Sequence, residues 1–172
     1  MKVVVIDGVD GAGQTAISDA LAHRLGGRYV KAFGGDTGLR IRALNESGAK
    51  AEAEALARAA VHRTIAQNKD ARLLVFDRHW LSILAYVSAD FAPNWRPFPA
   101  TVLLWATTHA LHARLLARGT PDAELERVAG YARRYDEIAA RYEVPRLETT
   151  HIGADEAARI IAQNGWVGRP AE

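Results

Sequence analysis

The feature that most constrains the fold is an apolar run that enters a glycine-rich turn near the amino terminus. Val3–Ile6 form the run, Gly8, Gly11 and Gly13 mark the turn, and the apolar spacing of residues 16–21 is typical of a helix. Glycines let successive backbone N–H groups converge on phosphate oxygens at a helix N-terminus. The stretch therefore predicts a strand, a phosphate-binding loop and a helix. The alternative is an ordinary turn between a strand and a helix.

This loop departs from the pattern G-x-x-x-x-G-K-[ST] at one position. Gln14 stands where the lysine belongs, whereas Thr15 keeps the hydroxyl that would bind Mg²⁺. A neutral amide can hydrogen-bond to a phosphate but cannot offset its charge, and in a site without water the difference can be about several kcal/mol. We expect the change to affect rate more than fold, with Lys31 or Arg118 as the candidates to supply the missing charge.

Composition narrows the class of protein. The chain has 172 residues, of which 49% are hydrophobic and 24% charged, so we expect one globular domain spanning residues 1–172. The absence of cysteine excludes disulfides, thiolate metal ligands and a cysteine nucleophile. No apolar run is long enough for a bilayer, which predicts a soluble, cytoplasmic protein without a membrane partner. With a net charge of +2 and no basic block, we expect no sequence-specific binding of nucleic acid.

The rest of the chain alternates predicted strands and helices. Strands are expected at 28–33, 73–76 and 101–105, and a short strand or loop at 146–150. Helices are expected at 39–45, 49–67, 80–87, 108–117, 124–142 and 155–164, and a proline-containing loop at 90–99. This alternation predicts an α/β fold with a mainly parallel sheet. Asp77 and Arg78 follow an apolar strand, at the sheet edge where α/β proteins bind ligands.

Three segments together resemble thymidylate kinase and its relatives among the P-loop nucleoside monophosphate kinases. They are the phosphate loop with Asp10, the segment 31–37, which is similar to the family's Arg-Glu-Pro-Gly-Gly-Thr, and the segment 77–86, which resembles its Asp-Arg-Tyr…Ser…Ala-Tyr signature. The resemblance covers nearly the whole chain. It implies a three-layer P-loop kinase fold, with helices on both faces of the sheet and a short lid around residues 114–126.

The resemblance also implies roles for individual residues. Those that would bind ATP are Gly8, Asp10, Gly11, Ala12, Gly13, Gln14, Thr15 and Ala16. Those that would bind the acceptor are Lys31, Arg58, Arg78, Ser82 and Tyr86. Thr15 and Asp77 would hold Mg²⁺, and residues 149–155 would hold adenine. The implied catalytic set is Asp10, Gln14, Arg78 and Arg118.

Several of these roles have alternatives. Asp77 can instead form a structural salt bridge with a neighbouring arginine. Arg118, like Arg114, can be a solvated arginine at a helix end instead of a lid residue that reaches the transferring phosphates. Relatives form homodimers through helices beside the acceptor site, which makes Ala49–Ala66 a candidate interface. The same face can equally be buried within one chain.

The sequence departs from the family at the acceptor side as well as at Gln14. Residues 31–33 lack the family's arginine, glutamate and proline, and residues 53–58 lack the aromatic that stacks on thymine but retain Arg58. Trp80 and Trp95 are packing residues or replacements for that aromatic. Thymidylate is therefore not assigned as the acceptor.

The function that follows is ATP- and Mg²⁺-dependent phosphate transfer to a nucleoside monophosphate or a related nucleotide. Two alternatives remain. One is a kinase of the same fold that acts on a nucleoside or another small alcohol. The other is a nucleotide-binding protein that has lost turnover.

Overall fold

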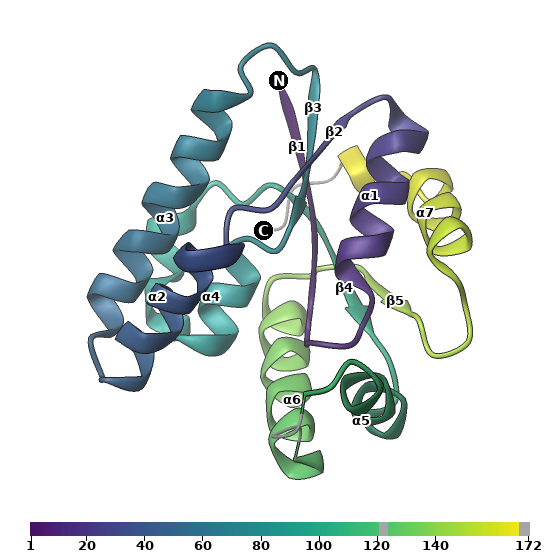
Figure 1. The fold of residues 1–172 in the computed structure, drawn as a ribbon. Coiled ribbons are helices and arrows are strands. Elements are labelled where there is room, and N and C mark those ends of the chain that lie inside the picture. The colour runs from purple at the N-terminus through teal and green to yellow at the C-terminus, as the bar shows by residue number, and fades with distance from the viewer. Residues whose placement is uncertain (121–123, 169–172) are drawn as a thin grey trace.

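The centre of the fold is a five-stranded sheet in which every neighbouring pair of strands is parallel. It is seen in a computed structural model that describes residues 1–120 and 124–168. The strand order is β2-β3-β1-β4-β5 (Figure 1). The strands are β1 (Lys2–Gly8), β2 (Arg28–Val30), β3 (Leu73–Asp77), β4 (Ala100–Trp105) and β5 (Arg146–Glu148).

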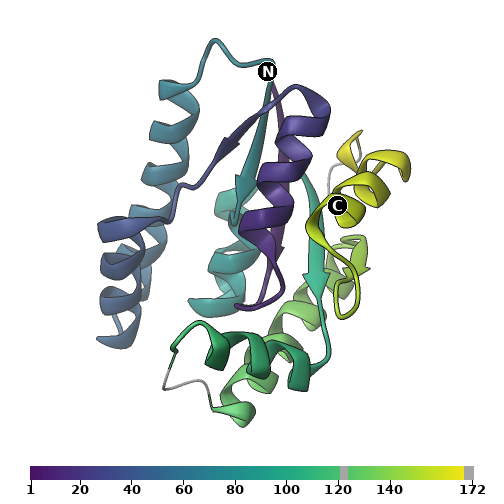
Figure 2. The same ribbon diagram turned by 45° about the vertical axis from the view of Figure 1, so that its right-hand side comes forward.

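Helices cover both faces of this sheet and complete three layers. Helices α1 and α7 pack together on one face, α4 and α6 cover the other, and α2 pairs with α3 beside them (Figures 1 and 2). The helices are α1 (Gln14–Leu25), α2 (Gly35–Glu46), α3 (Lys50–Gln67), α4 (Trp80–Tyr86), α5 (Thr108–Ala117), α6 (Leu125–Arg141) and α7 (Ala154–Gln163), with short 3-10 helices η1 (Ala89–Trp95) and η2 (Trp166–Gly168). The predicted α/β class with a parallel sheet is confirmed.

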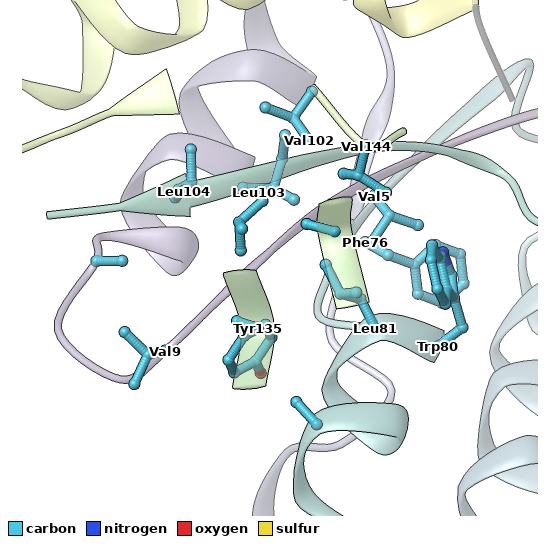
Figure 3. Close-up of a cluster of buried hydrophobic side chains, with 14 of the residues drawn as sticks. Val5, Val9, Phe76, Trp80, Leu81, Val102, Leu103, Leu104, Tyr135 and Val144 are labelled. Carbon is cyan, nitrogen blue, oxygen red and sulfur yellow. The ribbon is translucent and has the colours of Figure 1, made fainter. Parts of the chain in front are cut away.

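The hydrophobic core follows from the apolar runs of the central strands. Residues 4–6 of β1 and 74–76 of β3 are at most 1% exposed, because helices lie on both sides of these strands. Figure 3 shows side chains of β1, β3 and β4 gathered with Trp80 and Leu81 of α4 and Tyr135 of α6. The core thus joins the strands that carry the predicted motifs to the helices that follow them.

The strand register brings the two most informative motifs to the same edge of the sheet. Ile6 of β1 pairs with Asp77 of β3, and Gly8 of β1 pairs with Leu104 of β4. Because these strands are parallel, the glycine-rich turn after β1 and the Asp77-Arg78 pair after β3 leave the sheet side by side. The fold therefore juxtaposes sequence motifs that lie about 65 residues apart.

Some predicted boundaries differ from the observed ones. The strand predicted at 28–33 ends at Val30, and the helix predicted from residue 39 already begins at Gly35. Gly34 is extended at the start of this helix and Asp36 lies in its first turn, so the glycines belong to the helix start instead of a loop. The predicted loop at 90–99 contains η1, whose first turn is capped by the Ser88 hydroxyl.

The remaining predicted segments are present in the structure. The uncertain segment at 146–150 includes the edge strand β5, and the predicted helices after β3 and β4 are α4 and α5. The lid predicted at 114–126 includes residues 121–123, which lie outside the described residues. No helix in the described ranges is both long enough and apolar enough to cross a bilayer.

Candidate phosphate-binding site

The turn between β1 and α1 has the backbone conformation that its glycines permit. Gly8 has φ 154°, and a Cβ added there would lie 2.5 Å from the carbonyl oxygen of Leu104. Gly13 precedes α1 in a left-handed conformation with φ 98°, and no side chain caps the first turn of this helix. The free N–H groups of that turn therefore open toward solvent at the positive end of the helix dipole, as an anion-binding loop requires.

Gln14 points into this turn. Its side-chain Nε2 donates to the carbonyl oxygens of Gly8 and of Val9, the latter at 2.9 Å. A primary amide has two N–H bonds, so both are used within the loop. Gln14 is 5% exposed. The predicted contact between Gln14 and a phosphate would require these two internal hydrogen bonds to break.

The loop is also held from its other side by the connection after β5. The Thr149 hydroxyl donates to the carbonyl of Ala12 at 2.9 Å. The Arg114 guanidinium donates to the carbonyl of Gly11 at 3.1 Å and to those of Thr149 and Thr150 at 2.7 and 3.1 Å. Arg114 is therefore part-buried, and its hydrogen bonds fasten the loop after β1 to the segment where adenine binding was predicted.

A buried carboxylate, Asp7, lies directly beneath the loop. Its two oxygens accept hydrogen bonds from the backbone N–H groups of Gly8, His79 and Ser82, and from the Ser82 hydroxyl at 2.6 Å. Burial raises the pKa of Asp7, against the effects of Arg78 and of the hydrogen-bond donors. Sequence reasoning gave Asp7 no separate role, although an acid inside an apolar strand is a sign of a buried network. Asp7 thus connects the start of the loop with the start of α4.

The second carboxylate at this edge, Asp77, is 1% exposed and is bonded on one side only. Its Oδ2 accepts a hydrogen bond from Thr15 Oγ1 at 2.7 Å and one from the Tyr29 hydroxyl at 3.1 Å, and it lies 3.2 Å from Lys31 Nζ. Its Oδ1 is buried and has no hydrogen-bond partner among the described residues. Burial and the charge of Asp77 raise the pKa of the Tyr29 hydroxyl to about 12. Sequence reasoning did not identify Tyr29 as a residue of this site.

The oxygens of Thr15 and Asp77 form a donor set that fits Mg²⁺. This ion prefers oxygen ligands and is commonly held by one or two protein groups together with phosphates and water. The unpartnered Asp77 Oδ1 is a buried acceptor that a cation would satisfy. Across residues 1–120 and 124–168, no three His, Cys, Asp or Glu side chains gather closely enough to hold a metal ion. A magnesium ion at Thr15 and Asp77 would therefore complete its coordination with ligands from outside the protein.

Arg78, the residue after Asp77, is a second cation that lines the same cavity as Lys31. Its Nη2 lies 2.6 Å from Asp10 Oδ1, and its Nη1 donates to the Tyr135 hydroxyl at 3.2 Å and to the Ser82 hydroxyl at 3.4 Å. The guanidinium carbon lies 5.9 Å from the centre of the Tyr86 ring. Tyr135, which sequence reasoning also missed, brings α6 into the site. Ser82 and Tyr86 therefore both contact the Arg78 side chain.

The backbone at Arg78 is unusual. Its φ of 73° lies in the left-handed region, which a residue other than glycine adopts only where its surroundings hold it. Burial lowers the pKa of the guanidinium, but nearby Tyr135 and Tyr86 and the carboxylates of Asp10 and Asp7 outweigh it, so the pKa is raised well above the ordinary value. The Arg78 guanidinium is thus a fixed, permanently charged group at the cavity beside the loop.

Most of the predicted site residues meet around a cavity of about 130 Å³. The residues that line it are Asp10, Gly11, Gly13, Gln14, Thr15, Lys31, Asp77, Arg78 and Arg118. Gly8 and Ala12 form the loop itself, and Ala16 is exposed in the first turn of α1. Arg118 lies on this cavity with an exposed side chain at the end of α5. The spacing of the motifs therefore predicted a real cluster of polar groups.

Arg58 is the predicted site residue that lies elsewhere. It lines a separate cavity of about 270 Å³ with Trp95 and His79, and its Nε lies 3.2 Å from the buried Glu54 carboxylate. Trp80 is packed in the core, stacked on Phe98 at a ring distance of 4.1 Å. Neither Arg58 nor Trp80 therefore contributes to the cavity at the phosphate loop.

The candidate dimer face is partly used within the chain. Ala53, Ala57 and Ala60 of α3 are at most 5% exposed in the single chain. These residues fit the alternative in which the face is buried within one chain. A homodimer through the remaining, exposed residues of α3 stays a prediction.

Comparison with known proteins gives a likeness of fold. No protein-family model matches the chain, and no curated protein sequence matches it. Among solved structures, deoxyadenosine kinase from M. mycoides with the products dCMP and dCDP bound matches with a TM-score of 0.69 at 17% identity, covering 94% of this chain and 97% of that one. The same enzyme with bound dATP matches with a TM-score of 0.69 at 17% identity, over 95% and 98% of the two chains.

A protein of another name gives a similar result. The YorR protein from Bacillus subtilis, in complex with phosphorylated GDP, matches with a TM-score of 0.64 at 17% identity, over 95% of each chain. The fold is thus the P-loop kinase-like α/β fold that the sequence predicted. At these identities the likeness extends to the fold, and the chemistry has to be argued from the site.

Proposed function

We propose that this protein is a phosphotransferase that binds a nucleoside triphosphate with Mg²⁺ and transfers its terminal phosphate to a nucleotide acceptor such as a nucleoside monophosphate. The observation that carries the proposal is the single cavity on which the phosphate loop, the Thr15–Asp77 pair and Arg78 open together. Phosphate transfer depends mainly on positioning and on charge stabilisation. A cavity that joins main-chain amides, a magnesium-type oxygen pair and fixed cations offers both.

On the donor side, the loop amides and the N-terminus of α1 would hold the phosphates of the triphosphate. Thr15 and Asp77 would hold Mg²⁺, which when bound neutralises phosphate charge and orients the phosphates for in-line transfer. Arg114 and Thr149 keep the carbonyls of the loop turned away from the ligand. These contacts keep the loop in its binding shape before the ligand arrives.

On the acceptor side, Arg78 is the group suited to a phosphate. A guanidinium can bind a phosphate through two N–H groups, and Arg78 is held by Tyr135 and Ser82. Asp10 now occupies one side of Arg78 and is 54% exposed, so an incoming phosphate can displace it toward solvent. Arg118, which also lines the cavity, would act as the lid residue that approaches the transferring phosphate.

A kinase acting on a nucleoside or another alcohol is the second candidate. The observation that favours it is the Asp10 carboxylate, which lies at the cavity, 2.6 Å from Arg78. A carboxylate in this place can accept the proton of an acceptor hydroxyl as the new P–O bond forms. The likeness of fold to deoxyadenosine kinase is compatible with this acceptor.

Nucleotide binding without turnover is the third candidate, and Gln14 is its support because the amide brings no charge to the phosphates. Titration calorimetry with ATP and Mg²⁺, followed by a transfer assay with terminally labelled ATP, separates the three. The acceptor panel holds nucleoside monophosphates and the matching nucleosides. Transfer to monophosphates supports the proposal and transfer only to nucleosides supports the second candidate. Binding without transfer to any acceptor supports the third.

A matched pair of variants connects the result to the site. Thr15→Val removes the hydroxyl next to Asp77, and we expect it to weaken Mg²⁺-dependent ATP binding by about tenfold. Thr64→Val removes a hydroxyl that bonds only to its own helix, at the Ala60 carbonyl, and should leave binding unchanged. Equal binding by both variants and the unmodified protein would show that ATP binds elsewhere.

A further inference from the structure

The loop lacks a charged side chain of its own for the terminal phosphates. Gln14 occupies the position of the lysine in the pattern, and both of its N–H groups are donated to the carbonyls of Gly8 and Val9. The amide thus braces the loop internally and leaves the charge of a bound triphosphate without a partner from α1. If the cavity binds a triphosphate, the cation has to come from another element.

Lys31 lies where such a cation is needed. It follows the end of β2, and its Nζ lies 3.2 Å from Asp77 Oδ2 and 3.5 Å from Thr15 Oγ1. It lines the same cavity as the loop glycines, and its side chain is 41% exposed. A lysine has a flexible stem and three donors, so its ammonium group can stay near Asp77 and also contact a phosphate held beside Thr15.

The other cations on the cavity are placed for different tasks. Arg78 is already engaged by Asp10, Tyr135 and Ser82. Arg118 is exposed at the end of α5, and among the described residues it forms no ion pair or side-chain hydrogen bond. Of the three cations that line the cavity in the described part of the chain, Lys31 is the one within hydrogen-bond distance of Thr15, the residue after Gln14.

We propose that Lys31, which follows β2, is the phosphate-binding cation of this site. It supplies the positive charge that Gln14 does not provide within the loop. The inference rests on the proposed binding of a triphosphate at this loop. It adds a consequence for the ligand: the ammonium group approaches the phosphates from the side of Asp77. Recognition should therefore depend strongly on the β- and γ-phosphates and weakly on the base.

A charge-swap experiment tests this proposal. Binding of the non-hydrolysable triphosphate AMP-PNP, and of AMP as the control ligand, is measured by calorimetry with Mg²⁺ and again with EDTA. The variants are Lys31→Gln, Gln14→Lys and the double variant Gln14→Lys/Lys31→Gln, with Lys69→Gln as the matched control. Lys69 is exposed and lies outside the cavity. Circular dichroism verifies that each variant is folded.

We expect Lys31→Gln to weaken AMP-PNP binding by about tenfold or more in both conditions and to leave AMP binding nearly unchanged. The double variant should regain most of the lost affinity, because it returns a lysine to the loop, and Lys69→Gln should bind as the unmodified protein does. The salt dependence of AMP-PNP binding should fall in Lys31→Gln and recover in the double variant. Recovery through a different residue is a result that loss of a structural ion pair with Asp77 would not give.

Two results would overturn the inference alone. One is undiminished AMP-PNP binding by folded Lys31→Gln, and the other is a folded double variant that binds no better than Lys31→Gln. Failure of the unmodified protein to bind AMP-PNP at all would overturn the proposed function, and this inference with it. The two failures are therefore distinguishable in the same set of titrations.

Discussion

Asp7 and Asp77 lie near the carboxyl ends of the neighbouring strands β1 and β3 and are both buried, yet their surroundings differ. Asp7 accepts four hydrogen bonds spread over both of its oxygens. Asp77 has all its contacts on Oδ2, and Oδ1 has no hydrogen-bond partner in the described part of the chain. A buried acceptor without a partner is costly for stability alone, so it indicates a place for a ligand. The comparison separates a carboxylate that is fully bonded within the fold from one that has an unbonded oxygen, which is the oxygen that the proposed cation would use.

The variant Asp7→Asn tests this comparison with the largest expected effect, a loss of stability. The amide retains one acceptor oxygen and places an NH₂ group against donors, so charge-assisted hydrogen bonds in the core are lost. We expect a fall in the free energy of unfolding of about 3 kcal/mol, measured by urea denaturation. Asp19→Asn, at an exposed position in α1, is the control and should change stability little. An equally small effect of Asp7→Asn on stability would show that the Asp7 carboxylate does not stabilise the fold.

The next effect concerns His79, whose backbone N–H bonds to Asp7. Burial, with a smaller contribution from His62, lowers the pKa of the His79 imidazole from 6.5 to about 3. The unfolded chain therefore takes up a proton below pH 6.5 that the folded protein takes up only near pH 3, so stability is lost as the pH falls through this range. Between about pH 7.5 and pH 5 this group should cost about 2 kcal/mol of unfolding free energy.

Denaturation at several pH values, compared between the protein and His79→Phe, checks this prediction. The variant should lose that part of the pH dependence, whatever its absolute stability. Asp7, whose raised pKa acts in the opposite direction above pH 3.8, remains in both proteins and does not affect the difference. Identical slopes would mean that the pKa of His79 is not lowered in the folded protein.

Asp77→Asn tests the other side of the comparison and should affect binding more than stability. The amide oxygen can still accept from Thr15 and Tyr29, and the ion pair with the half-exposed Lys31 is worth little. We expect unfolding free energy to change by less than about 1 kcal/mol and Mg²⁺-dependent ATP affinity to fall by about tenfold. A large loss of stability with unchanged affinity would make Asp77 structural, as the salt-bridge alternative holds.

The smallest expected effect concerns Tyr135, which contacts both Ser82, a partner of Asp7, and Arg78. Tyr135→Phe removes the hydroxyl that lies 2.7 Å from Ser82 Oγ and accepts from Arg78. We expect a loss of about 1 kcal/mol in stability and a weaker affinity for the acceptor, because Arg78 loses one of its supports. Tyr142→Phe is the control, since its ring packs in the same region and its hydroxyl forms no side-chain hydrogen bond among the described residues. Equal effects of the two variants would exclude a positioning role for Tyr135.

The sequence predicted the fold and the cluster at the phosphate loop well where the signal is local. The apolar strands, the glycine-rich turn and the Asp77-Arg78 pair each follow from residues near one another, and parallel strands bring them to one edge. Long-range partners were harder to predict. Tyr135 reaches the site from a helix 53 residues after Ser82, and nothing in its own segment indicates this contact.

The predictions that differ from the structure also have physical explanations. The family resemblance suggested that Arg58 belongs to the acceptor site, but Arg58 pairs with the buried Glu54 and lines another cavity. The role of Gln14 depends on the carbonyls of Gly8 and Val9 turning inward, which only the folded loop shows. Arg114 resembled a solvated residue because its three partners are main-chain oxygens, which leave no trace in the sequence.

Arg114 has a consequence that reaches beyond its three hydrogen bonds. Its guanidinium is bonded to three carbonyl oxygens, one of them in the loop, and Arg114 is not among the residues that line the cavity. A positive charge beside the loop amides would add to their potential and favour an approaching anion without any direct contact with it.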